Sequence, residues 1–578
     1  MSGLTVATGG SETATRAVPA AHRVSACAAC RALGWLAAVV VVSAALFAVP
    51  QRAALAPVVE ADNAYIFLAA DRMYAGEGPT SIPPRAPLQP WEWRADWVFL
   101  TQWPVGYPAL ICATRWLTGL ATVAAAGALS VVGCAVALVA WFAWVRRCLP
   151  RGVASKLLAL VAAASTFSMD NLVNPASDTI LLAATPLVLL LAMWALRVPA
   201  GIDIQSPPRT ARSSALPLVL LGLFAGALVW VRYAAVFVPV AVGAYLVVEW
   251  CVLRRLRLRL VAAYAVGAVL PVLALFLLNR AFGPDVSAQQ QFNLGKDVSW
   301  HLPSGVLSTA WMKFTQQTPY AYRPEAWWLY AWILPAAGLT VPLVLRSARQ
   351  RLTGLLASPP MVLSAACVIV LLGMLVTASV LFQGKFNYVG LARYYQPVRP
   401  LYFVLFLGPL LLLPARWWRA ALCVPLIMAG VWFVKQDAWH AHTRMLAAQG
   451  GAEITDYSRW ARHFTPGARN LFAWLKTQAG PDLVVFSNFH EEIALETGIP
   501  ACPVPRNISQ LDAWLADIRA QRQQAALRVL FVLNPDNDYR DYYLESPESV
   551  VSHFRLRHIT RTNKPLHDYI YVSAAGQG

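Results

Sequence analysis

The sequence predicts a polytopic α-helical membrane protein with about eleven transmembrane helices and a small extracytoplasmic α/β domain at its carboxyl end. Of its 578 residues, 58% are hydrophobic and only 13% are charged. Soluble domains carry about 25% charged residues, so the composition excludes an ordinary soluble globular fold. The spacing of the apolar runs and the placement of the arginines predict the topology.

Apolar runs recur along the chain at lengths close to the roughly 20 residues that a helix needs to cross a bilayer. They lie at residues 33–49, 122–145, 154–169, 179–196, 214–231, 233–251, 260–279, 327–345, 360–382, 399–414 and 420–435. One helix over 214–251 would be about 57 Å long, nearly two crossings of a hydrocarbon core of about 30 Å. We therefore expect a tight hairpin that turns near Arg232 and Tyr233.

The basic residues predict the orientation of these spans. Lys and Arg number 47 against 29 Asp and Glu, which gives a net charge of +18. With the amino terminus in the cytoplasm, the inner loops collect basic residues, as the positive-inside rule requires. These are Arg146, Arg147, Arg151, Lys156, Arg197, Arg209, Arg212, Arg254, Arg255, Arg257, Arg259, Arg346, Arg349, Arg351, Arg416 and Arg419. The positive charge thus reflects orientation in the plasma (inner) membrane among membrane lipids, and it does not indicate nucleic acid as a partner.

The chain divides into three parts by composition. Residues 1–32 form a cytoplasmic tail, and residues 33–435 form the transmembrane domain, with a long first outer loop at 50–121 whose apolar pattern suits interfacial helices. Residues 436–578 form an extracytoplasmic α/β domain. In it, 483–486 and 529–533 are typical of buried strands, and 507–526 between them is typical of a helix.

Two acids follow the first span where apolar sequence gives way to the outer face. Glu60 and Asp62 lie at this boundary, and a carboxylate that is partly desolvated there suits a general base. The alternative is that Asp62 caps the helix that follows, because aspartate is a favoured N-cap residue. The sequence leaves both interpretations open.

Several short motifs resemble those of the GT-C superfamily of membrane glycosyltransferases, and most closely its protein-mannosyltransferase and lipid A aminoarabinose-transferase branch. They are the acid and tyrosine after the first span, Q-W-P-V-G-Y-P-A-L at 102–110, S-D at 177–178, W-V-R-Y at 230–233 and R-Y-Y-Q-P-V-R-P at 393–400. Members of that branch often show P-P-G-Y-P and a D-E pair. Here Trp103, Pro104 and Val105 precede the glycine, and Asn63 follows Asp62.

The resemblance implies a GT-C-like fold and a reaction outside the cytoplasm. A sugar on a polyprenyl-phosphate donor is transferred to a glycan, lipid or protein acceptor, and no cofactor is expected. Asp62 is the expected catalytic base, and Asp178 and Glu60 are acceptor-binding or auxiliary acids. One displacement by a base-activated acceptor inverts the anomeric carbon, whereas retention requires a second nucleophile.

The leaving lipid phosphate gains charge in the transition state, so cations at the outer face are expected to bind it. Four candidates fall at outer span ends, namely Arg232, Lys385, Arg393 and Arg399. Three tyrosines are candidates for donor or acceptor contacts, namely Tyr65, Tyr107 and Tyr394. For the cations of the loop at 382–400 the alternative is anchoring to lipid headgroups, and for Tyr394 and Tyr395 it is an interfacial aromatic belt. For Ser177 or Asp178 the alternative is an N-cap.

The histidines lack the spacing of metal ligands, and no required metal is expected. The segment F-H-E-E-I-A-L-E-T-G at 489–498 is interpreted as a helix start, with its acids at the positive end of the helix dipole. Two other functional classes remain as alternatives: a transporter or flippase of lipid-linked glycans, and a non-catalytic protein that binds envelope polymers.

Overall fold

A computed structural model describes residues 61–82, 97–101, 103–150, 152–166, 176–198, 214–282, 334–344, 346–381, 394–412, 466–487, 489–505, 507–533, 552, 558–561 and 569–573. The helices in its membrane part are α2 Ala61–Tyr74, α3 Gly106–Thr118, α4 Thr122–Cys148, α5 Val153–Ala164, α7 Ser177–Ala195, α8 Ala215–Val231, α9 Phe237–Cys251, α10 Leu258–Phe282, α13 Leu334–Val344, α14 Arg346–Leu356, α15 Pro359–Leu381 and α16 Arg399–Tyr402. Short helical turns are η1 Tyr233–Val236, η5 Gln396–Val398, η6 Phe403–Leu407 and η7 Gly408–Leu412. A two-stranded ribbon, β1 Thr80–Ser81 and β2 Val98–Phe99, lies between α2 and α3 in the sequence.

Five of the described helices are long and apolar enough to cross a membrane, so the chain is an integral membrane protein. They are Thr122–Cys148, Ser177–Ala195, Tyr233–Cys251, Leu258–Phe282 and Pro359–Thr377, and shorter apolar helices cover Ala154–Ala164, Ala215–Val231 and Gln396–Leu412. Every predicted span from 122–145 to 399–414 overlaps a described helix. The predicted spans 33–49 and 420–435, and the tail 1–32, lie outside the described residues.

The predicted hairpin at 232–233 is confirmed. Helix α8 ends at Val231, Arg232 is extended with φ −158° and ψ 129°, and η1 leads into α9. Helix α8 then packs on α10 through glycines: a Cβ at Gly226 would lie 2.3 Å from the Ala268 carbonyl oxygen. Small residues allow two membrane helices to approach this closely.

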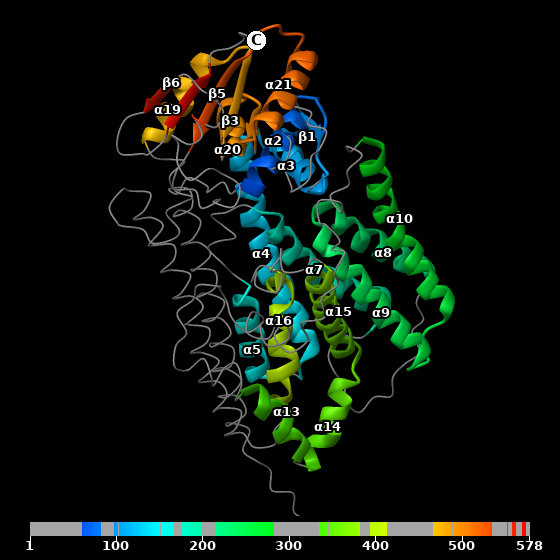
Figure 1. Ribbon diagram of the computed structural model, residues 1–578. Helices are drawn as coiled ribbons and strands as arrows, with labels where there is room; N and C mark the ends of the chain where they lie inside the picture. Colours follow the sequence, from blue (N-terminus) through cyan, green and yellow to red (C-terminus); the bar gives the residue numbers. More distant parts are fainter. Residues whose placement is uncertain are drawn as a thin grey trace, which may run out of the picture.

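Segments that the sequence predicts as inner loops meet at one end of the helical bundle. At one end, Trp144 of α4 donates a 3.2 Å hydrogen bond to Ser364 of α15, and Arg147 donates to the Val198 carbonyl just after α7. The basic helix α14 lies at this end, at the bottom of Figure 1, and α2 and α3 lie at the opposite end. We call these the α14 end and the α2 end. The predicted inner loops thus lie at the α14 end and the predicted first outer loop lies at the α2 end. Which side of the membrane each end faces stays a prediction.

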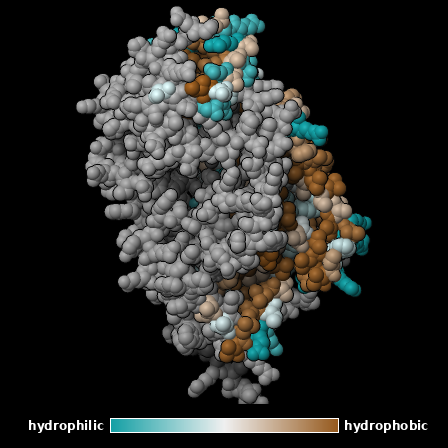
Figure 2. Space-filling view, in the orientation of Figure 1, coloured by the Kyte–Doolittle hydropathy of each residue, from teal (hydrophilic) through white to brown (hydrophobic). Residues whose placement is uncertain are grey.

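A broad apolar surface covers one flank of the bundle. Figure 2 shows hydrophobic residues over the side where α8, α9 and α10 lie. On α10, exposed side chains include Val266, Val269, Leu273, Phe276 and Leu277. Such a continuous apolar face suits contact with lipid chains.

The carboxyl-terminal α/β unit lies beyond the α2 end (Figure 1). Its helices are α19 Pro466–Gln478, α20 His490–Thr497 and α21 Ile508–Arg522. Its strands are β3 Leu483–Ser487, β4 Ala501–Pro503, β5 Arg528–Leu533, β6 His558–Arg561 and β7 Tyr569–Ser573, in the order β4-β3-β5-β7-β6. Strand β3 is parallel to β4 and β5, whereas β7 is antiparallel to β5 and β6. The strands predicted at 483–486 and 529–533 and the helix predicted at 507–526 therefore coincide with β3, β5 and α21.

Alternate residues of β3 fill two apolar layers, as expected for a strand buried on both faces. Val484 and Phe486 pack with Trp514 of α21. Leu483 and Val485 pack in the other layer, with Leu475 of α19 and Ile493 of α20. Helix α20 is thus held against the sheet through Ile493.

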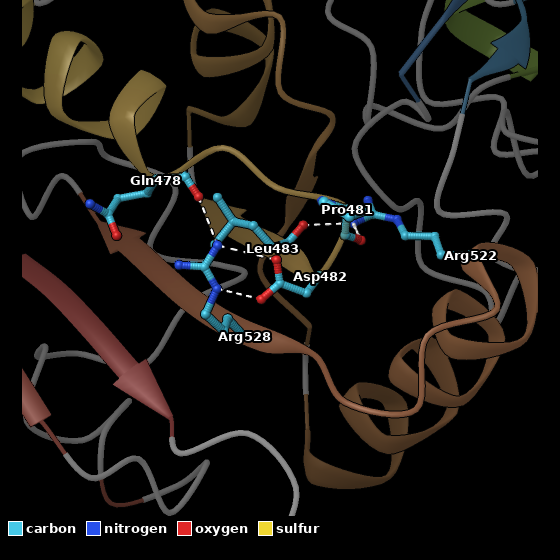
Figure 3. A network of polar contacts seen from close by, with 6 residues as sticks. All are labelled: Gln478, Pro481, Asp482, Leu483, Arg522 and Arg528. Carbon is cyan, nitrogen blue, oxygen red and sulfur yellow. Dashed lines mark hydrogen bonds and ion pairs between the residues drawn. The ribbon is translucent and has the colours of Figure 1, made fainter.

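Two arginines stabilise the junction between α19 and β3 through hydrogen bonds (Figure 3). Arg528 of β5 bonds both carboxylate oxygens of Asp482, one at 3.2 Å, and donates to the Gln478 carbonyl at 2.9 Å. Arg522 of α21 donates to the Leu483 carbonyl at 2.6 Å. The hydrogen bonds from Arg528 hold the pKa of Asp482 below its usual value.

Candidate functional site

Helix α2 carries the predicted catalytic acid at the α2 end of the bundle. It begins at Ala61, which places Asp62 in its first turn; the position of the Asp62 carboxylate lies outside the described side chains. Ala64, Phe67 and Ala70 of α2 pack against Tyr107 of α3. Tyr107 is 1% exposed, so the structure places this predicted contact residue in the packing between α2 and α3.

Two sequence motifs that lie far apart in the chain meet at a glycine. A Cβ at Gly106 would lie 2.4 Å from the carbonyl oxygen of Trp230, so only glycine fits this approach without displacement. Nearby, the Tyr233 hydroxyl donates a 2.8 Å hydrogen bond to the Thr101 carbonyl. The G-Y-P motif of the first loop is thereby fixed against the W-V-R-Y motif at the end of α8, a contact that the sequence did not predict.

Arg232 forms an ion pair with Asp178 across the ends of α8 and α7. Its Nη1 lies 2.7 Å from the Asp178 Oδ2 and donates a 3.2 Å hydrogen bond to Ser177 Oγ. The N-cap residue of α7 is Ala176, and no side chain caps this helix. The N-cap alternative for Ser177 and Asp178 is therefore wrong, and the carboxylate of Asp178 compensates the charge of Arg232.

A third segment reaches the same place through Tyr394. The Arg232 guanidinium carbon lies 5.4 Å from the centre of the Tyr394 ring, within the range of a cation–π contact. We call Ser177, Asp178, Arg232 and Tyr394 the Arg232 cluster. It brings together three predicted site residues from separate parts of the chain.

Within the part of the chain that the structure describes, no other predicted cation or acid belongs to the Arg232 cluster. Arg399 is 2% exposed at the start of α16, which packs against α4, α5 and α15. Tyr395 is fully buried, so the interfacial-belt alternative is wrong for this tyrosine. Glu60, Lys385 and Arg393 lie outside the described residues, and their roles stay predictions.

The first outer helix is also in contact with the carboxyl-terminal α/β unit. The Tyr65 hydroxyl lies 2.9 Å from His490 Nε2, and its ring stacks on Trp103 with centroids 4.9 Å apart. Helix α20 begins at His490 with Glu491 and Glu492 in its first turn, which confirms the helix start predicted at 489–498. Sequence reasoning missed the burial of His490, Glu491 and Glu492 and the contact of His490 with Tyr65 of α2, because nothing in the local pattern indicates a partner.

Among the described residues, no three His, Cys, Asp or Glu side chains are grouped closely enough to hold a metal ion. Independence from metals stays a prediction from the sequence.

Comparison with known proteins connects this geometry to a fold. No family model and no curated protein matches the sequence. Among solved structures, the chain matches ArnT from Cupriavidus metallidurans bound to undecaprenyl phosphate, with a TM-score of 0.52, 13% identity, and coverage of 94% of this chain and 98% of that chain. The apo form of ArnT matches with a TM-score of 0.50, 14% identity and the same coverage.

The chain shares its fold with ArnT. ArnT is a lipid A aminoarabinose transferase, so the resemblance inferred from the short motifs is confirmed at the level of fold. An oligosaccharyltransferase from Archaeoglobus fulgidus, in complex with an inhibitory peptide and a dolichol-phosphate, matches with a TM-score of 0.48 and 12% identity over 87% of this chain and 70% of that chain. Within this shared fold, the Arg232 cluster and α2 lie together at the α2 end of the bundle.

Proposed function

We propose that the protein is a membrane glycosyltransferase that transfers a sugar from a polyprenyl-phosphate donor to an acceptor on the outer face of the membrane. The observation that carries this proposal is the GT-C fold, shared over 94% of the chain with a transferase structure that holds undecaprenyl phosphate. The cluster of Asp178, Arg232 and Tyr394 also supports it. Each of these residues was predicted from a different sequence motif as a site residue for this reaction, and Arg232 contacts both of the others.

In this proposal, Asp62 is the general base. The acceptor hydroxyl or amine loses a proton as it attacks the anomeric carbon, and a carboxylate at the membrane surface can accept that proton. Asp62 lies in the first turn of α2, and the next residue, Asn63, is buried. A single displacement inverts the anomeric centre.

The Arg232 cluster supplies a fixed positive group for the donor phosphate. Both polar contacts of the Arg232 side chain use Nη1. Within the described part of the chain, its Nη2 and Nε make no hydrogen bond. A guanidinium held on one side by a carboxylate can still present parallel N–H groups to a phosphate oxygen. In this proposal, Arg393 and Lys385 add positive charge from the loop that precedes Tyr394, and Arg399 adds a buried charge at the start of α16.

The test uses the full chain in proteoliposomes with a labelled polyprenyl-phosphate sugar and a mixture of envelope acceptors. Asp62→Asn should reduce the transfer rate by about a hundredfold or more, because general-base catalysis contributes about 10²- to 10⁴-fold. Glu77→Gln is the matched control, since Glu77 is a half-exposed carboxylate just after the same helix. Wild-type-like transfer by Asp62→Asn removes the assigned base. Movement of the labelled lipid between leaflets without any transfer by the unaltered protein would favour the flippase alternative.

A further inference from the structure

We propose that His490 of α20 is a positioning residue for the face of α2 that carries Asp62, so that the carboxyl-terminal α/β unit completes the transferase site. This inference rests on the proposed function. It assigns to that unit a part in the chemical step, beyond covering the site or binding an acceptor.

The contact between the two parts of the chain is polar and enclosed. His490 Nε2 lies 2.9 Å from the Tyr65 hydroxyl, and Glu491 Oε2 lies 2.9 Å from His490 Nδ1. His490 and Glu491 are both 0% exposed, and Tyr65 is 3% exposed. With the ring proton on Nδ1, Nε2 accepts the hydrogen bond from the Tyr65 hydroxyl, and the Glu491 carboxylate lies on the Nδ1 side of the ring. The imidazole therefore lies between Glu491 of its own helix and Tyr65 of α2.

Tyr65 is placed to transmit this contact to Asp62. Residues three apart on a helix are neighbours on its surface, so Tyr65 and Asp62 share one face of α2. Three further contacts hold Tyr65: its ring stacks on Trp103, its carbonyl accepts a 3.0 Å hydrogen bond from Ser81, and Ala494 of α20 packs in the same apolar cluster. Tyr65 is thus held by α20 and by the first outer loop, and α20 lies next to α2 (Figure 1).

The residues at this contact indicate that α20 positions α2 and does not merely hold the two parts of the chain together. An apolar interface would hold α20 against α2 without desolvating ionisable groups, whereas His490, Glu491 and Glu492 are all buried here. Burying such groups carries a desolvation penalty, and the hydrogen bond between Tyr65 and His490 is directional, so it constrains how α20 meets α2. Displacement of a reacting group by about 1 Å can reduce a rate by about a hundredfold.

The kinetic test compares purified full-length variants with the labelled donor. His490→Ala and Tyr65→Phe should each lower kcat by about ten- to a hundredfold and leave KM for the donor within about twofold. The double variant should be no slower than the slower single variant, because both changes break one contact. His490→Gln, which can still accept from Tyr65, should recover part of kcat. Glu496→Gln, at an exposed position of the same helix, is the control and should match the unaltered protein.

A second readout does not depend on turnover. Amide hydrogen exchange over residues 61–74 should be faster in His490→Ala and in Tyr65→Phe than in the unaltered protein, and unchanged in Glu496→Gln. Tyr65→Phe keeps the aromatic ring and removes only the hydroxyl, so it tests the contact without disturbing packing on Trp103. Unchanged exchange, additive losses of kcat, or a rise in donor KM at constant kcat would each overturn the inference. If the unaltered protein transfers no sugar while exchange responds as expected, the proposed function fails and the contact between α20 and α2 stands.

Discussion

Arg232 and Asp178 form an ion pair of 2.7 Å between the ends of α8 and α7, and their side chains are only 15% and 8% exposed. Asp178 lies in the first turn of α7 and Arg232 in the turn after α8, so the pair joins the hairpin turn to the start of α7. Loss of one partner leaves the other as an uncompensated, largely buried charge.

The first prediction concerns the stability of this pair. Asp178→Ala and Arg232→Ala should each destabilise the protein by about 3–5 kcal/mol, because breaking a buried pair leaves an unpaired charge. The double variant should recover part of the loss, giving a coupling energy that a double-mutant cycle measures by thermal unfolding in detergent. Additive losses would mean that the two side chains do not interact.

The second prediction concerns the contact between the first loop and α8. Gly106→Ala places a Cβ 2.4 Å from the Trp230 carbonyl oxygen, so the backbone must move, at an expected cost of about 1–3 kcal/mol. Gly373→Ala is the matched control, because a Cβ there meets nothing within 4 Å in the interior of α15. It should be neutral or stabilising by about 0.5–1 kcal/mol. Equal melting temperatures for the two variants would contradict the close approach at Gly106.

The third prediction concerns the pH dependence of the carboxyl-terminal α/β unit. Hydrogen bonds from Arg528 lower the pKa of Asp482 from its ordinary value of 3.8. A lowered pKa in the folded state means that the stabilisation is present above the unfolded-state pKa and is lost as the pH falls through the folded-state pKa. Arg528→Met should therefore lower the melting temperature at neutral pH, and the difference from the unaltered protein should shrink below about pH 4.

The control for this pH profile is Arg519→Met, an exposed arginine on α21. Its melting temperature should follow that of the unaltered protein at every pH. A difference for Arg528→Met that stays constant between neutral and acidic pH would show that Asp482 is not the partner that matters.

The fourth prediction concerns binding of the lipid phosphate. Arg393 immediately precedes Tyr394 of the Arg232 cluster in the sequence, and Arg419 belongs to the loop expected on the cytoplasmic side. Arg393→Ala should weaken binding of undecaprenyl phosphate by about tenfold or more, since a hydrogen bond to a charged group contributes about 1.5–3 kcal/mol. Arg419→Ala should have little effect in the same equilibrium binding assay. Equal weakening would refute the orientation inferred from the arginines.

Hydropathy predicted the membrane helices because the bilayer itself imposes their length and composition. The hairpin at Arg232 followed from length, since one helix of that extent does not fit the bilayer, and the positive-inside rule agrees with it. Strands β3 and β5 were predicted because continuous apolar runs bounded by polar residues are typical of a buried parallel sheet. Each of these features depends on the residues of its own segment and on whether lipid or protein surrounds that segment.

The candidate site was predicted as a set of residues and not as an arrangement. Asp178, Arg232 and Tyr394 were each selected from a motif, but their contacts depend on how three segments pack, which no local pattern encodes. Tyr65 and His490 are 425 positions apart in the chain. His490 was correctly placed at a helix start, and its partner was missed because tertiary docking decides it.

That separation also affects how the protein is made. Helix α2 emerges early in synthesis, and the helix that covers its Tyr65 side emerges 425 positions later. A nascent chain interrupted ahead of α20 contains every membrane helix named above and still lacks the contact between α20 and α2. Incompletely folded chains are recognised by chaperones and proteases, so premature termination yields membrane-inserted polypeptides that are targets for degradation.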